Sequence, residues 1–362
     1  MKLHLLFVGN KFIYNKPLQE YIVRKVEEKT DFIHSITYFK ENDNSLFLYL
    51  EQELNANTKL IIITTKQNFS TVGKLISTVT SDNQILKENM LIPSNCSVFQ
   101  EGSYLLEYKD SLTNVLHIDE MQKLPEILID SSSSKTTIHI FDEDKESATA
   151  LLSPIAQTHD VRINILTLVD GWLYVNVTSK KYGNISKFIN SVKQLLPNKL
   201  ITTKNIILYI IEKLSKQNKQ ITFAESCTGG LLSYYFTKAN GASKVLSGSL
   251  VTYSNELKEN WLGVEHETIE AYGAVSQDVV KQMSDGAINV SDADYAISVS
   301  GIAGDTGGSD EKPVGTVHIS VRSKEKHQEI ALKLNGDRNY IQHQSALFAI
   351  KMLIIHDKKI FF

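Results

Sequence analysis

The stretch Ile221–Lys238 constrains the fold of this chain most strongly, because it places an apolar strand, a small polar turn and an apolar helical run in direct succession. The turn has the sequence Ala224-Glu225-Ser226-Cys227-Thr228-Gly229-Gly230. We predict a strand before it and a helix over Thr228–Lys238. This order puts the Ser226 hydroxyl at a helix start, beside backbone N–H groups that have no partner within the helix. Such a place can hold an anion or stabilise an oxyanion.

Strand-like and helix-like patterns also alternate in the N-terminal segment. We predict helices over Leu18–Glu28 and Ser45–Leu54, and strands over Leu3–Val8, His34–Phe39 and Lys59–Thr64. Continuous apolar strands that alternate with helices are typical of a parallel sheet covered on both faces. Residues 1–130 are therefore predicted to form a three-layer, parallel-sheet α/β domain, although the pattern weakens after Leu91.

Two further domains follow a polar linker at residues 130–135. Residues 136–197 show a βαββα order with an Asp170-Gly171 hairpin signal, which predicts a small α+β connecting module. In residues 200–358 strands and helices interleave again, which predicts a C-terminal α/β layered domain.

Composition excludes several classes of protein. The 362 residues are 42% apolar and 22% charged, with a formal net charge of −3, so we expect no nucleic-acid binding. No apolar run is long enough for a membrane span. The first nine residues are too short for a signal sequence and are expected to form a buried strand. The two cysteines, Cys96 and Cys227, lie in different predicted domains, which indicates a reducing, cytoplasmic setting. The scattered histidines predict no metal site.

Three side chains could support serine chemistry. Ser226 is a candidate nucleophile, and Lys258 is a candidate base if burial lowers its pKa. Tyr253 ends the strand that precedes Lys258. Taken alone, Ser226 is also explained as a helix cap, and Lys258 as a solvated helix lysine. Cys227 is a rival nucleophile, although no histidine lies near it in sequence.

Two later features could bind an anion. A glycine-rich loop follows the predicted strand Tyr295–Ser300 and can expose backbone N–H groups. It lacks the Gly-Lys-Ser/Thr of a Walker loop, so nucleotide triphosphate binding is not indicated. Arg338 lies in the first turn of the last predicted helix, where a cation opposes the helix dipole. A guanidinium there could hold a phosphate.

Six ordered motifs across residues 200–356 together resemble the CinA C-terminal domain family of nicotinamide-nucleotide amidases: Ala-Glu-Ser-Cys-Thr-Gly-Gly at 224–230, Val-Thr-Tyr-Ser-Asn-Glu-Leu-Lys at 251–258, Gly-Ala-Val-Ser at 273–276, Gly-Ile-Ala-Gly at 301–304, Lys-Pro-Val-Gly-Thr-Val at 312–317 and Gly-Asp-Arg at 336–338. The resemblance implies hydrolysis of nicotinamide mononucleotide to nicotinate mononucleotide and ammonia, without a metal or cofactor. It also implies a cytoplasmic homodimer.

The resemblance further implies a role for each matching residue. Ser226 would be the nucleophile, Lys258 its general base and Tyr253 a hydrogen-bonding assistant. The substrate and oxyanion would be held by the helix start and the glycine-rich loop, with Arg338 on the phosphate; these residues are Thr228, Gly229, Gly230, Gly301, Ile302, Ala303 and Gly304. Asp305 stands where the family usually carries proline and adds a negative charge near the expected phosphate site.

In this family an N-terminal domain like that of molybdopterin-binding proteins can act as a metal-dependent ADP-ribose pyrophosphatase. Its Thr-Gly-Gly-Leu-Gly-Pro-Thr loop and acidic ligands are replaced here by Thr64-Thr65-Lys66-Gln67-Asn68-Phe69-Ser70-Thr71-Val72. We therefore expect a degenerate scaffold domain without pyrophosphatase activity. A non-catalytic scaffold role for the whole chain, in competence or DNA damage, is the alternative that the family's name suggests.

Overall fold

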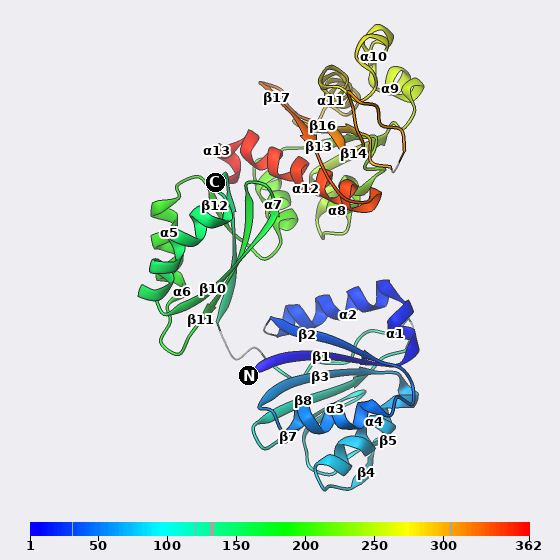
Figure 1. The fold of residues 1–362 in the computed structure, drawn as a ribbon, viewed down its shortest axis with the longest axis vertical. Coiled ribbons are helices and arrows are strands. Elements are labelled where there is room, and N and C mark those ends of the chain that lie inside the picture. Colours follow the sequence, from blue (N-terminus) through cyan, green and yellow to red (C-terminus); the bar gives the residue numbers. More distant parts are fainter. Residues whose placement is uncertain (31, 120, 131–133, 305) are drawn as a thin grey trace. The chain divides into compact units, whose positions relative to one another are not determined.

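The computed structural model describes residues 1–30, 32–119, 121–130, 134–304 and 306–362, and the predicted linker 130–135 lies partly outside them. The chain forms two compact units, Met1–Ser134 and Lys135–Phe362 (Figure 1). The predicted boundary between a connecting module ending at residue 197 and a domain starting at residue 200 falls inside the second unit and stays a prediction. None of the described helices is long and apolar enough to cross a membrane.

The first unit is built on a six-stranded sheet of order β2-β1-β3-β8-β7-β6. Its strands are β1 (Lys2–Val8), β2 (Ile33–Phe39), β3 (Thr58–Thr64), β6 (Cys96–Gln100), β7 (Ser103–Tyr108) and β8 (Ser111–His117). The four strands β2, β1, β3 and β8 are parallel to one another. β7 is antiparallel to both of its neighbours, β8 and β6. The predicted parallel sheet is therefore observed, and the antiparallel pairing is confined to the edge formed after Leu91, where the sequence pattern weakens.

Helices cover both faces of this sheet, as predicted. Alternate residues of β1 point to opposite faces: Leu5 packs in the core that includes Ile22, and Leu6 in the core that includes Leu50 and Phe69. The helices are α1 (Asn10–Tyr14), α2 (Lys16–Lys29), α3 (Ser45–Leu54) and α4 (Lys66–Val79), and a small hairpin pairs β4 (Gln84–Lys87) with β5 (Met90–Pro93).

The second unit begins with an antiparallel sheet of order β10-β11-β9-β12. Its strands are β9 (Lys135–Phe141), β10 (Val161–Val169), β11 (Trp172–Ser179) and β12 (Leu200–Thr202), and its helices are α5 (Lys145–Thr158) and α6 (Ile185–Leu195). The helices bury one face of the sheet, where Leu152 and Phe188 contact the strand residues. The predicted βαββα order is observed, with β12 added. Phe141 and Trp172 instead join the core shared with the rest of the unit.

A mixed five-stranded sheet of order β14-β13-β15-β16-β17 forms the centre of the remaining residues. Its strands are β13 (Ile221–Glu225), β14 (Leu246–Val251), β15 (Tyr295–Gly301), β16 (Thr316–Ser323) and β17 (His327–Lys333). β14, β13 and β15 are parallel, so their carboxyl ends meet at one edge. Side chains that follow Glu225, Val251 and Gly301 are thereby brought together, and ligands commonly bind at such an edge.

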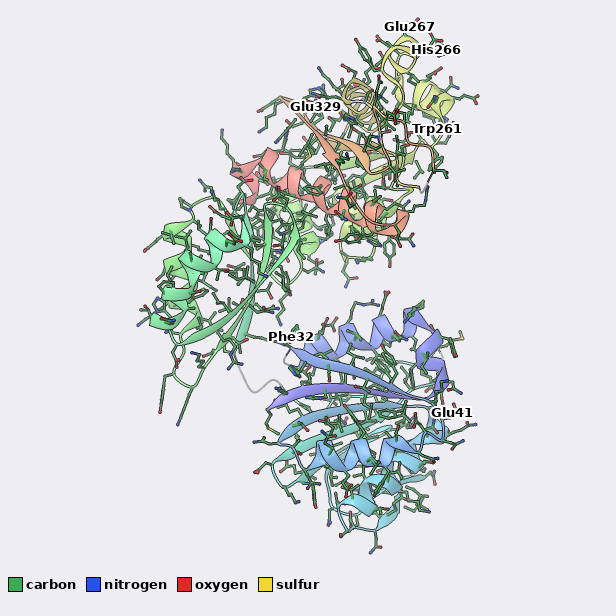
Figure 2. All side chains as sticks on the ribbon, in the orientation of Figure 1. Phe32, Glu41, Trp261, His266, Glu267 and Glu329 are labelled. Atoms are coloured by element: carbon green, nitrogen blue, oxygen red, sulfur yellow. The ribbon has the colours of Figure 1, made fainter. Side chains whose placement is uncertain are left out.

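Helices also lie on both faces of this sheet. One face packs against α11 (Gln277–Ser291), with α9 (Asn255–Leu262) and α10 (His266–Tyr272) beyond it. Trp261 and His266 on α9 and α10 are at the surface (Figure 2). The other face is covered by α7 (Ile206–Lys216), α8 (Leu231–Thr237), α12 (Arg338–His356) and α13 (Lys358–Phe361), and the short helix η1 (Ala242–Lys244) follows α8.

Candidate active site

Ser226 and Lys258, predicted as nucleophile and base, lie in contact. Ser226 follows β13 directly, and Lys258 lies on α9, which begins soon after β14. The Lys258 Nζ is 3.3 Å from Ser226 Oγ. Nζ also donates to the carbonyl oxygens of Thr252 over 2.9 Å and Tyr253 over 3.3 Å. The lysine is only 1% exposed, and burial lowers its pKa.

These contacts allow Lys258 to act as a base in its uncharged form. A neutral –NH₂ has two N–H donors and one lone pair. The carbonyl groups of Thr252 and Tyr253 accept the two N–H groups, so the lone pair is left for the Ser226 hydroxyl proton. Nζ is therefore arranged to accept a proton from Oγ.

Cys227, the rival nucleophile, has a different environment. It is 4% exposed and belongs to the hydrophobic core. Burial raises the pKa of its thiol to about 12, so the thiolate is scarce at neutral pH. Its carbonyl oxygen accepts a hydrogen bond from Gln342 Nε2 over 2.7 Å, which ties the serine turn to α12.

The helix after the turn begins later than predicted. α8 starts at Leu231, not at Thr228, because Gly229 and Gly230 take positive φ angles of 59° and 96°. Glycine reaches this left-handed region at little cost. The N–H of Gly229 donates to the Ser226 carbonyl over 3.0 Å, which closes a tight turn in front of the helix.

The start of α8 is already occupied by a carboxylate from the chain itself. Glu225 is fully buried, and its two carboxylate oxygens accept the N–H groups of Gly230, Leu232 and Ser233 over 2.9–3.1 Å. An anion satisfies the free N–H groups of a helix start and the positive end of its dipole. These three N–H groups are therefore not available to a substrate. No role was predicted for Glu225 from the sequence.

Two other N–H groups lie near Ser226. Those of Cys227 and Thr228 donate to no acceptor among the residues that the structure describes. Thr228 Oγ1 is also buried, and it has no hydrogen-bond partner among the described residues. Of the predicted binding residues, Thr228, Gly229 and Gly230 do not line the pocket in front of Ser226.

That pocket has a volume of about 180 Å³. Besides Ser226 and Lys258, its walls include five other residues singled out from the sequence, namely Cys227, Tyr253, Gly301, Ala303 and Arg338. Asn255, Ala274, Val275 and Ser300 also line it and were not predicted. Their signal was present in part, because Ala274 and Val275 belong to the quoted Gly-Ala-Val-Ser motif. Ser300 Oγ donates to the Ala274 carbonyl over 2.8 Å and holds that loop at the pocket.

The glycine-rich loop contributes less of its backbone than expected. The N–H of Ile302 donates to the Thr316 carbonyl and its carbonyl accepts from Gly315, so its polar backbone groups are used in the β15–β16 connection. Ile302 and Gly304 are not lining residues. Gly304 lies against the guanidinium instead, since a Cβ there would be 3.1 Å from Arg338 Nη1. Asp305 lies outside the described residues.

Arg338 and Tyr253 meet at the mouth of this pocket. Arg338 Nη2 donates to Tyr253 Oη over 2.7 Å, which joins α12 to the end of β14. Both side chains are exposed. Arg338 makes no ion pair with any acidic residue that the structure describes.

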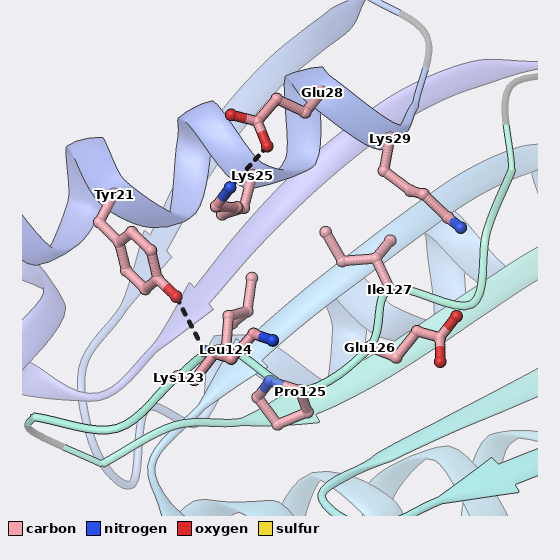
Figure 3. Close-up of a pocket in the computed structure, with 9 residues that line it drawn as sticks. All are labelled: Tyr21, Lys25, Glu28, Lys29, Lys123, Leu124, Pro125, Glu126 and Ile127. Carbon is pink, nitrogen blue, oxygen red and sulfur yellow. Dashed lines mark hydrogen bonds and ion pairs between the residues drawn. The ribbon is translucent and has the colours of Figure 1, made fainter. Parts of the chain in front are cut away.

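Pockets also occur in the first unit. One, of about 460 Å³, lies past the ends of its parallel strands and is lined by Lys11, Glu41 and Asp119 among others. Lys11 and Asp119 form an ion pair at 3.5 Å. Another, of about 270 Å³, lies between α2 and the segment Lys123–Ile127 (Figure 3). Among the described residues, no three His, Cys, Asp or Glu side chains are grouped as metal ligands.

Known proteins resemble the part of the chain that carries the serine pocket. Residues 203–356 match the model of the CinA C-terminal domain. A CinA-like protein of Fervidobacterium nodosum is 48% identical over 144 residues, which are 40% of this chain and 35% of the relative. A CinA-like protein of Thermosipho melanesiensis is 38% identical over 195 residues, 53% of this chain and 48% of the relative. The chain thus spans less than half the length of these relatives.

A solved structure is also similar to part of the chain. The competence/damage inducible protein CihA of Agrobacterium tumefaciens is 36% identical, and the match covers 42% of this chain and 96% of that protein with a TM-score of 0.41. The family model covers the residues that form the serine pocket, from the Ser226 turn to Arg338. The domain formed by residues 203–356 therefore belongs to the CinA C-terminal domain family.

Proposed function

We propose that this protein is an amidohydrolase that converts nicotinamide mononucleotide to nicotinate mononucleotide and ammonia. The observation that carries the proposal is the contact between a buried lysine amine and a serine hydroxyl, 3.3 Å apart, at the wall of a pocket. The lysine Nζ also donates to the carbonyl oxygens of Thr252 and Tyr253. A serine needs a base to become a nucleophile, and lysine can replace histidine in that role.

The reaction has two halves. The Ser226 hydroxyl passes its proton to Lys258 Nζ while Oγ bonds to the carboxamide carbon. The carbon–nitrogen bond then breaks, and the departing nitrogen takes the proton back from Lys258 and leaves as ammonia. Water attacks the resulting ester, gives a proton to Lys258 and releases the carboxylate, and Ser226 regains its proton. The cationic pyridinium ring disfavours a second positive charge nearby and so helps to keep Lys258 neutral.

Oxyanion stabilisation is assigned to the N–H groups of Cys227 and Thr228. They belong to the turn that carries Ser226 and have no acceptor among the described residues. Donors at the place where negative charge develops contribute about 10²–10³-fold each to kcat in serine hydrolases. Gly230 is a weaker candidate, because its N–H already donates to Glu225.

Arg338 is the proposed contact for the substrate phosphate. It lines the pocket, and its guanidinium is held by Tyr253 Oη. Tyr253 therefore acts in this proposal by orienting the guanidinium, while its backbone carbonyl orients Lys258. Arginine is well suited to a phosphate because its N–H groups match two phosphate oxygens at once.

The first test is ammonia release from nicotinamide mononucleotide in the presence of a chelator, with wild-type protein and Ser226→Ala. Metal-independent turnover that disappears in the variant is the expected result. Cys227→Ser should keep its activity, because burial holds the thiol in its protonated form. Absence of turnover by folded wild-type protein would favour the alternative scaffold role. The homodimer and the loss of pyrophosphatase activity by the first unit stay predictions.

A further inference from the structure

We propose that Glu225 is a positioning residue that holds the Ser226 turn in its reactive geometry by capping α8 from within the chain. The inference rests on the proposed serine chemistry and assigns a new task to the residue beside the nucleophile. Glu225 ends β13, Ser226 begins the turn, and α8 begins five residues after Ser226, at Leu231. The carboxylate therefore bridges the strand and the helix on either side of the reactive serine.

Each oxygen of the Glu225 carboxylate accepts two hydrogen bonds. Its Oε2 accepts the N–H groups of Gly230 and Leu232 over 3.1 Å and 3.0 Å. Its Oε1 accepts the N–H of Ser233 over 2.9 Å and the hydroxyl of Ser249, on β14, over 3.2 Å. A buried carboxylate with no cation beside it is costly unless its lone pairs are satisfied. Here four donors and the positive end of a helix dipole do so.

The turn has two internal hydrogen bonds, from the Gly229 N–H to the Ser226 carbonyl and from the Leu231 N–H to the Thr228 carbonyl, but few bonds to the rest of the fold. The Ser226 N–H donates to the Val299 carbonyl of β15, and the Cys227 carbonyl accepts from Gln342. The next residues include two glycines with positive φ angles, which can adopt many other conformations. Without the carboxylate, three N–H groups at the start of α8 would lose their acceptor. The turn between the fixed strand and the loosened helix would then be free to shift.

A small shift is sufficient to lower the rate. A displacement of about 1 Å of a catalytic group can cost about 10²-fold. Ser226 Oγ must stay within reach of Lys258, while the Cys227 and Thr228 N–H groups must face the reacting oxygen. All three groups lie on the turn that Glu225 anchors. Loss of this anchor should therefore lower kcat while KM, set by Arg338 and the pocket walls, changes little.

Glu225→Gln is the informative variant, because glutamine has the same shape but replaces one oxygen by an NH₂ group. That group cannot accept the Ser233 N–H or, in the other orientation, those of Gly230 and Leu232. Ser249→Ala is the matched control, since it removes a single donor and leaves the three helix N–H contacts. The full chain of each variant is compared for kcat and KM with nicotinamide mononucleotide, for labelling rate by a fluorophosphonate serine probe, and for helix content.

We expect Glu225→Gln to lower kcat and the labelling rate of Ser226 by about 10–10² fold, and Ser249→Ala to keep both within about twofold of wild type, as expected for a contact whose neighbours remain. Labelling of folded Glu225→Gln at the wild-type rate would overturn the inference, even if wild type hydrolyses the nucleotide. If Glu225→Gln does not fold, Glu225→Asp replaces it, since it keeps the charge but shortens the reach. Wild-type kcat in that variant would also overturn the inference.

The probe separates this inference from the proposed function. Wild type that is labelled at Ser226 but does not release ammonia would refute the substrate, while the labelling rates of the variants would still decide the role of Glu225. Wild type that is neither labelled nor active has no activated serine for Glu225 to position, and this result would overturn both.

Discussion

Lys258→Met should abolish the chemistry and leave the protein folded. Methionine has nearly the length of the lysine side chain and suits the buried position, where Lys258 is 1% exposed. The variant removes the nitrogen that lies 3.3 Å from Ser226 Oγ. No other described side chain donates to Ser226 Oγ or accepts from it. The lost contact should therefore affect kcat directly.

The effect of Lys258→Met on the reaction rate should be much larger than its effect on stability. Loss of a general base costs about 10²–10⁴-fold in rate. For stability, the buried Thr252 carbonyl loses its donor, which costs about 1–3 kcal/mol. The exposed Tyr253 can replace its lost donor by water. Removal of a buried amine acts in the opposite direction, because its charged form is disfavoured there. The unfolding free energy should thus fall by at most about 3 kcal/mol, below the usual total of about 5–15 kcal/mol.

The assay is ammonia release across pH, with Lys333→Met, an exposed lysine of β17, as control. The neutral amine is the active form, so the wild-type rate should rise with pH and level off above the Lys258 pKa. Because burial lowers that pKa from its ordinary 10.5, the plateau should begin below pH 10.5. More than a tenth of wild-type activity in folded Lys258→Met, or a rate that climbs through pH 10.5, would refute the reasoning.

Three further predictions concern other parts of the second unit. Arg338→Ala should raise KM for nicotinamide mononucleotide about tenfold or more with little change in kcat, and should not alter kinetics with the riboside, which lacks the phosphate; equal effects on both would contradict phosphate binding. Gly286→Ala should lower the unfolding free energy by about 1–3 kcal/mol in denaturant titrations, since a Cβ there would lie 1.8 Å from the Leu262 carbonyl oxygen. Gly248→Ala is the control and should have a smaller effect, because a Cβ at Gly248 would have no heavy atom within 4 Å. Burial lowers the pKa of His139 from 6.5 to about 4, so protonation of the unfolded chain should remove about 3 kcal/mol of stability as pH falls from 6.5 to 4; a His139→Asn variant with an equally steep pH dependence would exclude this cause.

Elements with a strong apolar period were predictable from the sequence. The bounds of α3 (Ser45–Leu54) and α6 (Ile185–Leu195) agree with their predictions, because their apolar residues recur at helical spacing along one face. In the first unit, the strands β4 to β8 were not predicted. β5 and β6 are short, and β6 lies at a sheet edge with most of its residues at least partly exposed, so neither has the apolar run that marks a buried strand.

The meeting of Ser226 and Lys258 was predictable for a topological reason. Each follows a strand, and β13 and β14 are parallel neighbours, so the residues after them share one edge. The position of the helix start was not predictable in the same way. Thr228 continues the helical pattern of the following residues, but the chain makes a turn through Gly229 and Gly230 first. Local periodicity cannot distinguish these outcomes, because both place Leu232 and Phe236 in the core.

The contacts of Glu225 explain why the N–H groups of the helix start do not serve the site that the sequence suggests. A serine at a helix start suggests that the free N–H groups of the helix serve the reaction. In this chain a carboxylate one residue before the serine takes those groups. The serine turn is thereby left with the N–H groups of Cys227 and Thr228 for the oxyanion. An acidic residue beside a nucleophile would repel a developing negative charge if it were free. Because it is buried and accepts hydrogen bonds from the helix N–H groups, the same residue can instead hold the nucleophile in place.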